Sequence, residues 1–497
     1  MPTDVKHSVF ERIATYRNLG AVLGACVGPG PTPGSERFYQ SYIYTGGAFE
    51  LVAIDPDTGD AQVFPSTVPT EDGAWAVTVG PDGNVYVGTL PNAHLQRLDP
   101  QQGTFTDLGR PSDSEQYIWQ LAVATDGKLY GCTYPSAKLV SYDPSTGQSA
   151  DLGRMDETEL YARQIAADDD GFVYVGIGTS KTQIVGYEVA TGLHRPLLPE
   201  RFQVTGIASV RRGADGRVYG QVGEQHFRLI GWEAAPVASE AVPAAESRNC
   251  LADGRFVEVV DREIQVHDPQ SGSQTKQLLQ YAGNNIRLYR LGWGPDGLLY
   301  GSSVLPAHFF RVQPATGGIE HLGRVGGGEV YSFLQDGDRL LAAVYSGLAP
   351  LMTYDPGRAF EPSAAPEGNP LLVNYPRQDS GWRPVAMIHG PDHRIYLGAT
   401  AGYGKLGGPL TVWDPTSNEV ESFHHVVTDQ SVSTLAAVGT LIAGGTTVVG
   451  GGGSHPTQTE ARLFLWDPGT REKLAEIVPV PGAGQITDLL ALPNGRI

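Results

Sequence analysis

Aromatic, basic and histidine side chains recur at fixed distances from an Asp-Gly-like turn. Nine residues before the turn aspartate stand Tyr117, Tyr161, Arg287 and Arg383; seven before it stand Trp75, Trp119, Arg163 and Tyr289. Twelve residues after it stand His94, Lys138 and His308, with Lys181 and His226 one position short. An aromatic ring can stack on a sugar, and a guanidinium can hold a carboxylate through two hydrogen bonds. The three columns therefore favour recognition of a sugar that bears a carboxylate.

A repeat positions these columns. The stretch PDGNVYVGTLPNAHLQRLDPQQGTFTDLG at residues 81–109 recurs 44 residues later as TDGKLYGCTYPSAKLVSYDPSTGQSADLG. Each repeat holds four short runs of strand-forming residues, separated by Asp, Gly or Pro. Four strands in a repeat of this length are typical of a β-propeller blade, and sequence self-similarity at such a period indicates a repeat architecture. The chain is predicted to be an all-β array of four-stranded propeller blades.

Counting the repeats predicts how the blades are grouped. Propellers usually have four to eight blades. We therefore expect a seven-bladed propeller over residues 21–324 and further blades over 325–497, with the last blade incomplete. The further blades belong to a second ring or continue the first. Residues 1–20 form an N-terminal segment, in which ATYRNLG (14–20) resembles a closing fourth strand. A single large ring closed by that strand is the alternative.

Composition limits the partners and the compartment. The formal charge of −19 argues against binding to nucleic acid or to an anionic membrane surface. No apolar run is long enough to span a bilayer, and the N-terminus lacks the apolar core of a signal peptide. The three cysteines lie far apart without metal-type spacing and are expected to be buried thiols. These features predict a cytoplasmic protein.

Two long loops extend the predicted rim near the end of the chain. The linkers between the second and third strands of the last repeats grow to residues 400–409 and 445–461, and the first of them carries Tyr403 and Lys405. Long loops on a regular scaffold are often functional, and glycine-rich ones can close over a ligand. A role as simple solvent loops is equally compatible with the sequence.

The segments DPSTGQSADLG and DPQQGTFTDLG resemble the bacterial multi-bladed propeller repeats of the YVTN, NHL and quinoprotein-like kinds. The resemblance implies a propeller fold. Some propellers of this kind are polysaccharide lyases that act on uronate-containing glycans, so it also makes lyase activity an expectation. The tryptophan docking motif of quinoproteins is missing, and no metal-binding motif occurs. We therefore expect neither a cofactor nor a metal.

The leading hypothesis is a lyase that acts on uronate-bearing oligosaccharides in the propeller funnel. The candidates for proton transfer are His94, His308, Tyr117 and Tyr161. The candidates for binding the acidic sugar are Trp75, Trp119, Lys138, Arg163, Lys181, Arg287, Tyr289, Arg383, Tyr403 and Lys405. Two alternatives stay open: a noncatalytic propeller that binds a protein or glycan partner, and a tailoring enzyme with a small-molecule substrate.

Overall fold

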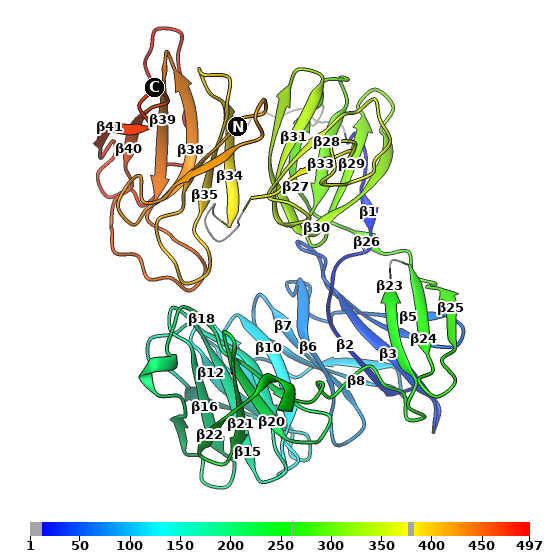
Figure 1. Ribbon diagram of the computed structural model, residues 1–497. Helices are drawn as coiled ribbons and strands as arrows, with labels where there is room; N and C mark the ends of the chain where they lie inside the picture. Colours follow the sequence, from blue (N-terminus) through cyan, green and yellow to red (C-terminus); the bar gives the residue numbers. More distant parts are fainter. Residues whose placement is uncertain (1–11, 261, 376–381) are drawn as a thin grey trace, which may run out of the picture. The chain divides into compact units, whose positions relative to one another are not determined.

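The computed structural model describes residues 12–260, 262–375 and 382–497. Nearly all regular structure in these residues is β-strand, and the helices among them are two short 3-10 turns, Glu200–Phe202 and Ser239–Ala241. The strands form antiparallel sheets, mostly of four strands in chain order (Figure 1). This is the arrangement of propeller blades, so the prediction of an all-β propeller array is confirmed. No helix in the described residues has the length and apolar character to cross a membrane.

The N-terminal unit comprises Gly20–Ala282 with Gly452–Ser454. Its sheets are β2 (Val22–Pro29), β3 (Glu36–Tyr42), β4 (Glu50–Ile54) and β5 (Ala61–Pro65); β6 (Gly73–Val79), β7 (Val85–Leu90), β8 (Leu95–Asp99) and β9 (Thr104–Asp107); β10 (Tyr117–Val123), β11 (Leu129–Tyr134), β12 (Lys138–Asp143) and β13 (Gln148–Arg154); β14 (Tyr161–Ala167), β15 (Phe172–Thr179), β16 (Gln183–Glu188) and β17 (His194–Pro196), with β18 (Gly206–Ile207) beside β15; β19 (Ser209–Arg212), β20 (Val218–Val222), β21 (Gln225–Ile230) and β22 (Glu233–Val237); and β23 (Phe256–Val260), β24 (Glu263–His267) and β25 (Gln274–Leu278).

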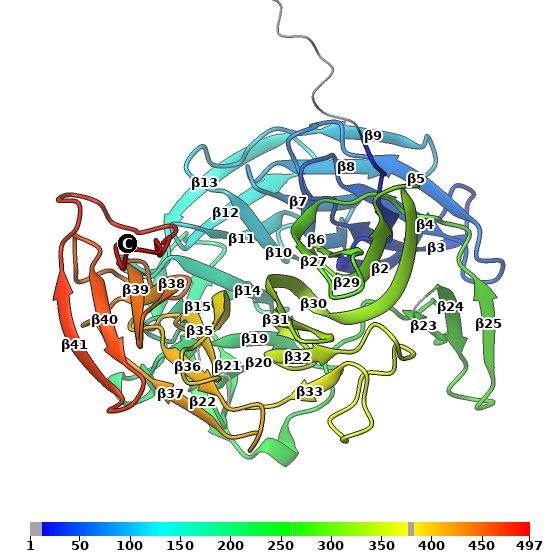
Figure 2. The same cartoon turned by 90° about the horizontal axis from the view of Figure 1, so that it is seen from above.

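The first strands of five successive sheets in this unit lie against one another. Figure 2 shows β6, β10 and β14 side by side, and β2 and β19 continue the row at its two ends. A segment at residues 246–249 connects these ends. Glu246 N donates to Arg212 O of β19 at 2.9 Å, and Arg248 O accepts from Val27 N of β2 at 2.7 Å. The first strands therefore form the inner wall of this unit, and their side chains are placed to meet there.

The C-terminal unit comprises residues 12–19, Gly283–Gly451 and His455–Ile497. Its sheets are the pair β1 (Arg17–Asn18) and β26 (Asn284–Asn285); a seven-stranded sheet of β27 (Leu288–Trp293), β28 (Leu299–Ser303), β29 (Ala307–Gln313), β30 (Gly318–Asp336), β31 (Arg339–Gly347), β32 (Leu351–Tyr354) and β33 (Leu371–Val373); β34 (Arg383–His389), β35 (Ile395–Thr400), β36 (Leu410–Trp413) and β37 (Val420–Phe423); and β38 (Ser431–Val438), β39 (Leu441–Thr447), β40 (Leu463–Asp467) and β41 (Glu472–Ile477). The long strand β30 ends one blade and begins the next.

The boundary between the two units falls at Ala282–Gly283. The predicted boundary at residue 324 lies inside β30. The strand β1, from the predicted closing segment 14–20, pairs with β26. Residues 1–11 of the predicted N-terminal segment lie outside the described residues. The predicted number of blades in each ring stays a prediction.

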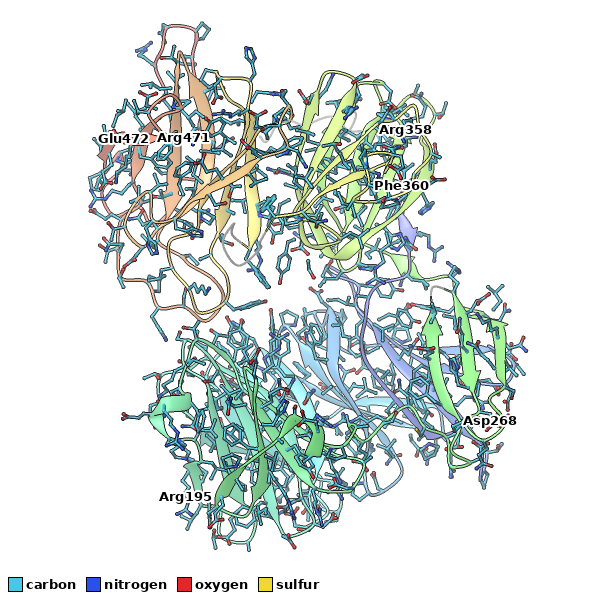
Figure 3. All side chains as sticks on the ribbon, in the orientation of Figure 1. Arg195, Asp268, Arg358, Phe360, Arg471 and Glu472 are labelled. Atoms are coloured by element: carbon cyan, nitrogen blue, oxygen red, sulfur yellow. The ribbon has the colours of Figure 1, made fainter. Side chains whose placement is uncertain are left out.

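In five of the Asp-Gly-like turns, the aspartate is hydrogen-bonded to a tyrosine of the buried core. The aspartate accepts a hydrogen bond from a tyrosine hydroxyl of the second strand, while the tyrosine ring packs inside the sheet. These pairs are Asp82–Tyr86 at 2.8 Å, Asp126–Tyr130 at 3.0 Å, Asp215–Tyr219 at 2.8 Å, Asp296–Tyr300 at 2.8 Å and Asp392–Tyr396 at 2.9 Å. A buried hydroxyl needs a partner, which explains why Asp and Tyr recur together. The outer strands are more exposed, and Arg195 of β17 and Glu472 of β41 lie at the periphery of Figure 3.

A glycine in the second strand lets neighbouring blades approach each other. A Cβ atom at Gly176 of β15 would lie 2.2 Å from the carbonyl oxygen of Ala208, which precedes β19. We expect Gly176→Ala to lower the free energy of unfolding by about 1–3 kcal/mol, because the backbone must move. Gly47→Ala is the control, since its Cβ would meet nothing closer than 3.6 Å. Equal shifts in melting temperature for the two variants would contradict this account of blade packing.

Candidate functional site

Eight of the first strands in the described residues carry a one-residue β-bulge near their start, and β19 and β23 do not. The bulged residues are Leu23, Trp75, Trp119 and Arg163 in the N-terminal unit and Tyr289, Tyr331, Val385 and Ser433 in the C-terminal unit. A bulged residue has no partner in the ladder and its side chain is turned to a new direction. The column seven residues before the turn is therefore a column of bulges. The column nine residues before the turn stands two residues earlier, where the strand begins.

Alignment on the bulge adds one residue that the sequence columns miss. Two residues before the bulged Tyr331 stands Glu329, a buried carboxyl group at 9% exposure. The turn after this strand, at Asp336, follows the bulge by two fewer residues than in the neighbouring repeats. The position nine residues before Asp336 is therefore Gly327 and not Glu329. The strand-start column of the C-terminal unit thus reads Arg287, Glu329 and Arg383 in three consecutive blades.

The rim of the N-terminal unit is aromatic and cationic. The ring centroids of Trp75 and Trp119 lie 5.3 Å apart, and the Arg163 guanidinium lies 4.6 Å from the Trp119 ring. The ring of Tyr161 packs against that of Tyr134 in a tilted arrangement, with centroids 4.5 Å apart. Within the described residues, no carboxylate lies at ion-pair distance from Arg163, and the buried indole nitrogen of Trp119 has no hydrogen-bond partner. We call this cluster, with Tyr117, the N-terminal rim. It brings together five of the predicted site residues.

The rim of the C-terminal unit joins a cation to phenols and a carboxyl group. The Arg383 guanidinium lies 4.5 Å from the ring of Tyr345 and 5.8 Å from that of Tyr403. The hydroxyls of Tyr345 and Tyr403 are 3.4 Å apart, and Tyr331 donates to Glu329 at 2.9 Å. Trp382 packs against Tyr403 with centroids 5.7 Å apart, and Tyr289 against Tyr331 at 4.8 Å. These residues form the C-terminal rim. Three of the predicted residues meet in it, namely Tyr289, Arg383 and Tyr403.

Burial and neighbouring groups shift the pKa values of ionisable groups in the C-terminal rim. Burial raises the pKa of the Glu329 carboxyl, although Tyr331 and Arg383 act in the opposite direction. Burial also raises the pKa of Tyr345, and the neighbouring Tyr403 raises it further. For Arg383, burial disfavours the charge, but the surrounding tyrosines raise its pKa, so the guanidinium stays cationic. A cation and a carboxyl group whose pKa is raised by burial therefore share this rim.

The third sequence column lies at the start of the third strand and is tied to carboxylates. His94 Nδ1 lies 3.0 Å from Asp107, and Lys138 Nζ lies 2.7 Å from Asp151. Lys181 Nζ lies 3.6 Å from Asp156. Asp107 and Asp151 begin the Asp-Leu-Gly sequence at the end of their repeats. Their carboxylates therefore hold the side chains of His94 and Lys138 in place. The predicted catalytic role of His94 and the binding roles of the two lysines stay predictions.

Three further predicted residues belong to the C-terminal unit, namely His308, Arg287 and Lys405, as does Tyr289 of the C-terminal rim. His308 lies in β29, where its backbone N–H donates to Ser303 at 3.2 Å. Arg287 is exposed just before β27, and Tyr289 within β27 is 44% exposed. Lys405 lies in the loop after β35, and its carbonyl accepts from Gly451 N at 2.9 Å. Among the described residues, no group of three or more His, Cys, Asp or Glu side chains is placed to hold a metal ion.

The chain is similar to solved structures but matches no protein-family model and no curated protein. A streptogramin B lyase structure is similar at 13% identity, covering 58% of this chain and 94% of that one, with a TM-score of 0.35. The extracellular domain of the one-component system BT4673 of B. thetaiotaomicron is similar at 13% identity, covering 97% and 81%, with a TM-score of 0.29. Virginiamycin B lyase of Staphylococcus aureus is similar at 12% identity, covering 74% and 90%, with a TM-score of 0.26. At these values the comparisons carry no argument about function.

Proposed function

We propose that the protein is a carbohydrate-active enzyme, a lyase on uronate-bearing oligosaccharides, with its reaction centre at the C-terminal rim. One observation carries the proposal. Arg383 is held over two tyrosine rings, without a carboxylate at ion-pair distance among the described residues, in the rim that also holds the buried carboxyl of Glu329. Perturbed ionisable groups beside an available cation are characteristic of reaction centres.

The reaction would be an elimination next to the uronate carboxylate. A base removes the proton from the carbon that bears the carboxylate, and the electron pair forms a double bond to the neighbouring carbon. The glycosidic oxygen leaves that carbon and takes a proton from an acid. Arg383 would bind the carboxylate with two hydrogen bonds and stabilise the negative charge that develops on it. Atoms balance without a cofactor or a metal.

Two groups of the rim match the acid and the base. Glu329 keeps its proton beyond the ordinary range of a carboxyl because burial raises its pKa, so it suits the acid that protonates the leaving oxygen. Tyr403 contacts both Arg383 and the hydroxyl of Tyr345. Tyr403 lies beside the Arg383 cation and is our candidate for the base. Trp382 packs against Tyr403 and would line the sugar ring.

A second candidate function is noncatalytic binding of an acidic glycan. The observation that favours it is the raised pKa of Tyr345 and of Tyr331, caused chiefly by burial in both cases. Phenols of that kind donate hydrogen bonds well but are poor bases at neutral pH. A rim of such phenols around Arg383 would hold a uronate without turning it over.

One assay separates the two functions. The full chain is incubated with a panel of oligouronates of differing sugar and linkage, and the near-ultraviolet absorbance of the unsaturated product is followed. Neutral oligosaccharides of matching linkage are the control, and they should give no signal because Arg383 would have no carboxylate to bind. Absorbance from at least one oligouronate is the expected result. Binding of oligouronates without any absorbance would favour the noncatalytic function and overturn the lyase.

A further inference from the structure

The N-terminal rim offers a free cation on a fixed support. Trp119 is 8% exposed and holds the Arg163 guanidinium over its ring at 4.6 Å, which limits the positions that the side chain can take. Arg163 is itself half-buried and has no carboxylate at ion-pair distance among the described residues. The guanidinium edge is therefore available for an outside anion. An anion that binds it meets a group that is already ordered, so little side-chain entropy is lost.

Aromatic faces stand beside this cation. Trp75 and Tyr117 are half-buried, and their rings lie 5.3 Å and 5.1 Å from that of Trp119. Tyr161 packs against Trp119 at 5.9 Å and closes the same cluster. Half-exposed aromatic rings next to a guanidinium fit a flat, carboxylate-bearing ring such as an acidic sugar, because the ring can stack while the acid is held.

A second arginine lies near Arg163 at the inner strands of this unit, although the whole chain is acidic. Arg248 lies against the inner strands, where its guanidinium donates to Leu121 O of β10 at 3.1 Å. Burial raises the pKa of the Cys132 thiol to about 12, and the guanidinium groups of Arg163 and Arg248 both act against that rise. The fields of the two cations therefore overlap at the inner wall. An anion entering at the rim gains from both.

The carboxylates next to this rim are already engaged. Glu115 accepts from Thr133 Oγ1 at 2.7 Å and from Ser136 N at 3.1 Å, and Glu159 accepts from Ser180 N at 2.9 Å. Both are almost completely buried and hold the loop between second and third strands onto the incoming first strand. They are structural, so the rim supplies a cation and aromatic faces without a free carboxyl to carry a proton.

We propose that the N-terminal rim is a second, noncatalytic binding site for a carboxylate-bearing sugar. Arg163 holds the carboxylate, Trp75 and Tyr117 stack on the ring, and Trp119 positions Arg163. The site shares its ligand class with the proposed function but uses none of the residues assigned to the reaction. The proposal for this site is therefore tested by ligand binding and not by catalytic activity.

The test measures binding in the full chain whose C-terminal rim has been disabled by Arg383→Gln. The probes are sodium glucuronate and sodium galacturonate, with glucose and galactose as neutral counterparts, and the readout is saturation-transfer NMR with titration. A uronate should bind and its neutral counterpart should not. Adding Arg163→Gln should weaken uronate binding about tenfold or more, because a charge-assisted hydrogen-bonded pair is lost. Adding Arg163→Lys should weaken it less, since the charge remains but the planar fork does not.

The matched control is Arg195→Gln. Arg195 of β17 stacks over Trp232 at 4.4 Å in the same unit, but it is exposed, and its loss should leave uronate binding unchanged. Equal melting temperatures for the Arg163 and Arg195 variants establish that both fold. Uronate binding that ignores Arg163→Gln, or that is absent with Arg383→Gln alone, would overturn this site and leave the lyase intact. Binding that survives while no oligouronate is ever cleaved would leave this site standing and remove the lyase.

Discussion

Glu329→Gln is expected to lower kcat on an oligouronate by about 10²- to 10⁴-fold, the usual contribution of a general acid. Glutamine keeps the size and the hydrogen bond from Tyr331 but has no proton to give to the leaving oxygen. KM should change little, because the carboxylate of the substrate is held by Arg383. The measurement is steady-state kinetics on the substrate found by absorbance.

The control for this variant is Glu320→Gln, which removes an exposed carboxylate of the same unit that pairs with Arg311 at 2.7 Å. It should leave kcat unchanged. If Glu329→Gln retained full kcat while Glu320→Gln behaved as expected, Glu329 would have no part in proton transfer and the proposed mechanism would be wrong.

Glu329→Gln, which should lower kcat, is also expected to become more stable relative to the wild type as pH rises. Burial raises the pKa of Glu329, so the folded chain holds a proton there that the unfolded chain has already lost. Between the ordinary pKa of a glutamate and this raised value, the stability of the wild type falls as pH rises. Glutamine does not titrate. The melting temperature of Glu329→Gln minus that of the wild type should therefore increase from acidic to neutral pH. A difference that does not change with pH would contradict the raised pKa.

Arg383→Gln is expected to lower kcat/KM by about 10²- to 10³-fold, because the charge that develops on the uronate carboxylate loses its partner. Arg383→Lys should recover only part of this, since an ammonium lacks the planar fork that binds a carboxylate twice. Stacking on Tyr345 and Tyr403 also favours arginine. Kinetics and uronate titration of both variants make the comparison.

Arg358→Gln controls for loss of an arginine in the same unit, because Arg358 is exposed and donates to the carbonyl of Glu367 at 2.5 Å (Figure 3). It should behave as the wild type. If Arg383→Gln and Arg358→Gln gave the same kcat/KM, the anion would be bound elsewhere and the C-terminal rim would lose its role.

The repeat was enough to predict the blades, because its marks act locally. Asp82 accepts from Tyr86 four residues later, and Asp99 accepts from the backbone N–H groups of the two residues after Pro100. Such contacts depend on nearby residues alone, so they can be read from one stretch of chain. The same locality explains why Trp75, Trp119 and Arg163 were found: they hold equivalent places in successive repeats.

The rest depended on contacts that spacing does not encode. A count from the turn does not reach Glu329, because the turn at Asp336 lies two residues closer to the bulge than in the neighbouring repeats. The pairing of His94 with Asp107 joins two strands whose side chains meet only after the sheet has formed. The division of the site residues between two units follows from packing along the whole chain. The spacing of residues identifies equivalent positions in different blades. It does not show which of these positions are in contact.

The β-bulge of the first strand has a consequence for how such a protein diversifies. Because the bulged residue contributes nothing to the ladder, Leu23, Trp119, Arg163 and Ser433 occupy equivalent places without altering the sheet that carries them. Mutation at these places can sample new specificities while the backbone hydrogen bonds of the sheet are kept. After duplication of a blade, each copy can drift at its bulge independently. The same places form a natural set for a combinatorial library, in which the scaffold is held constant and the ligand is selected.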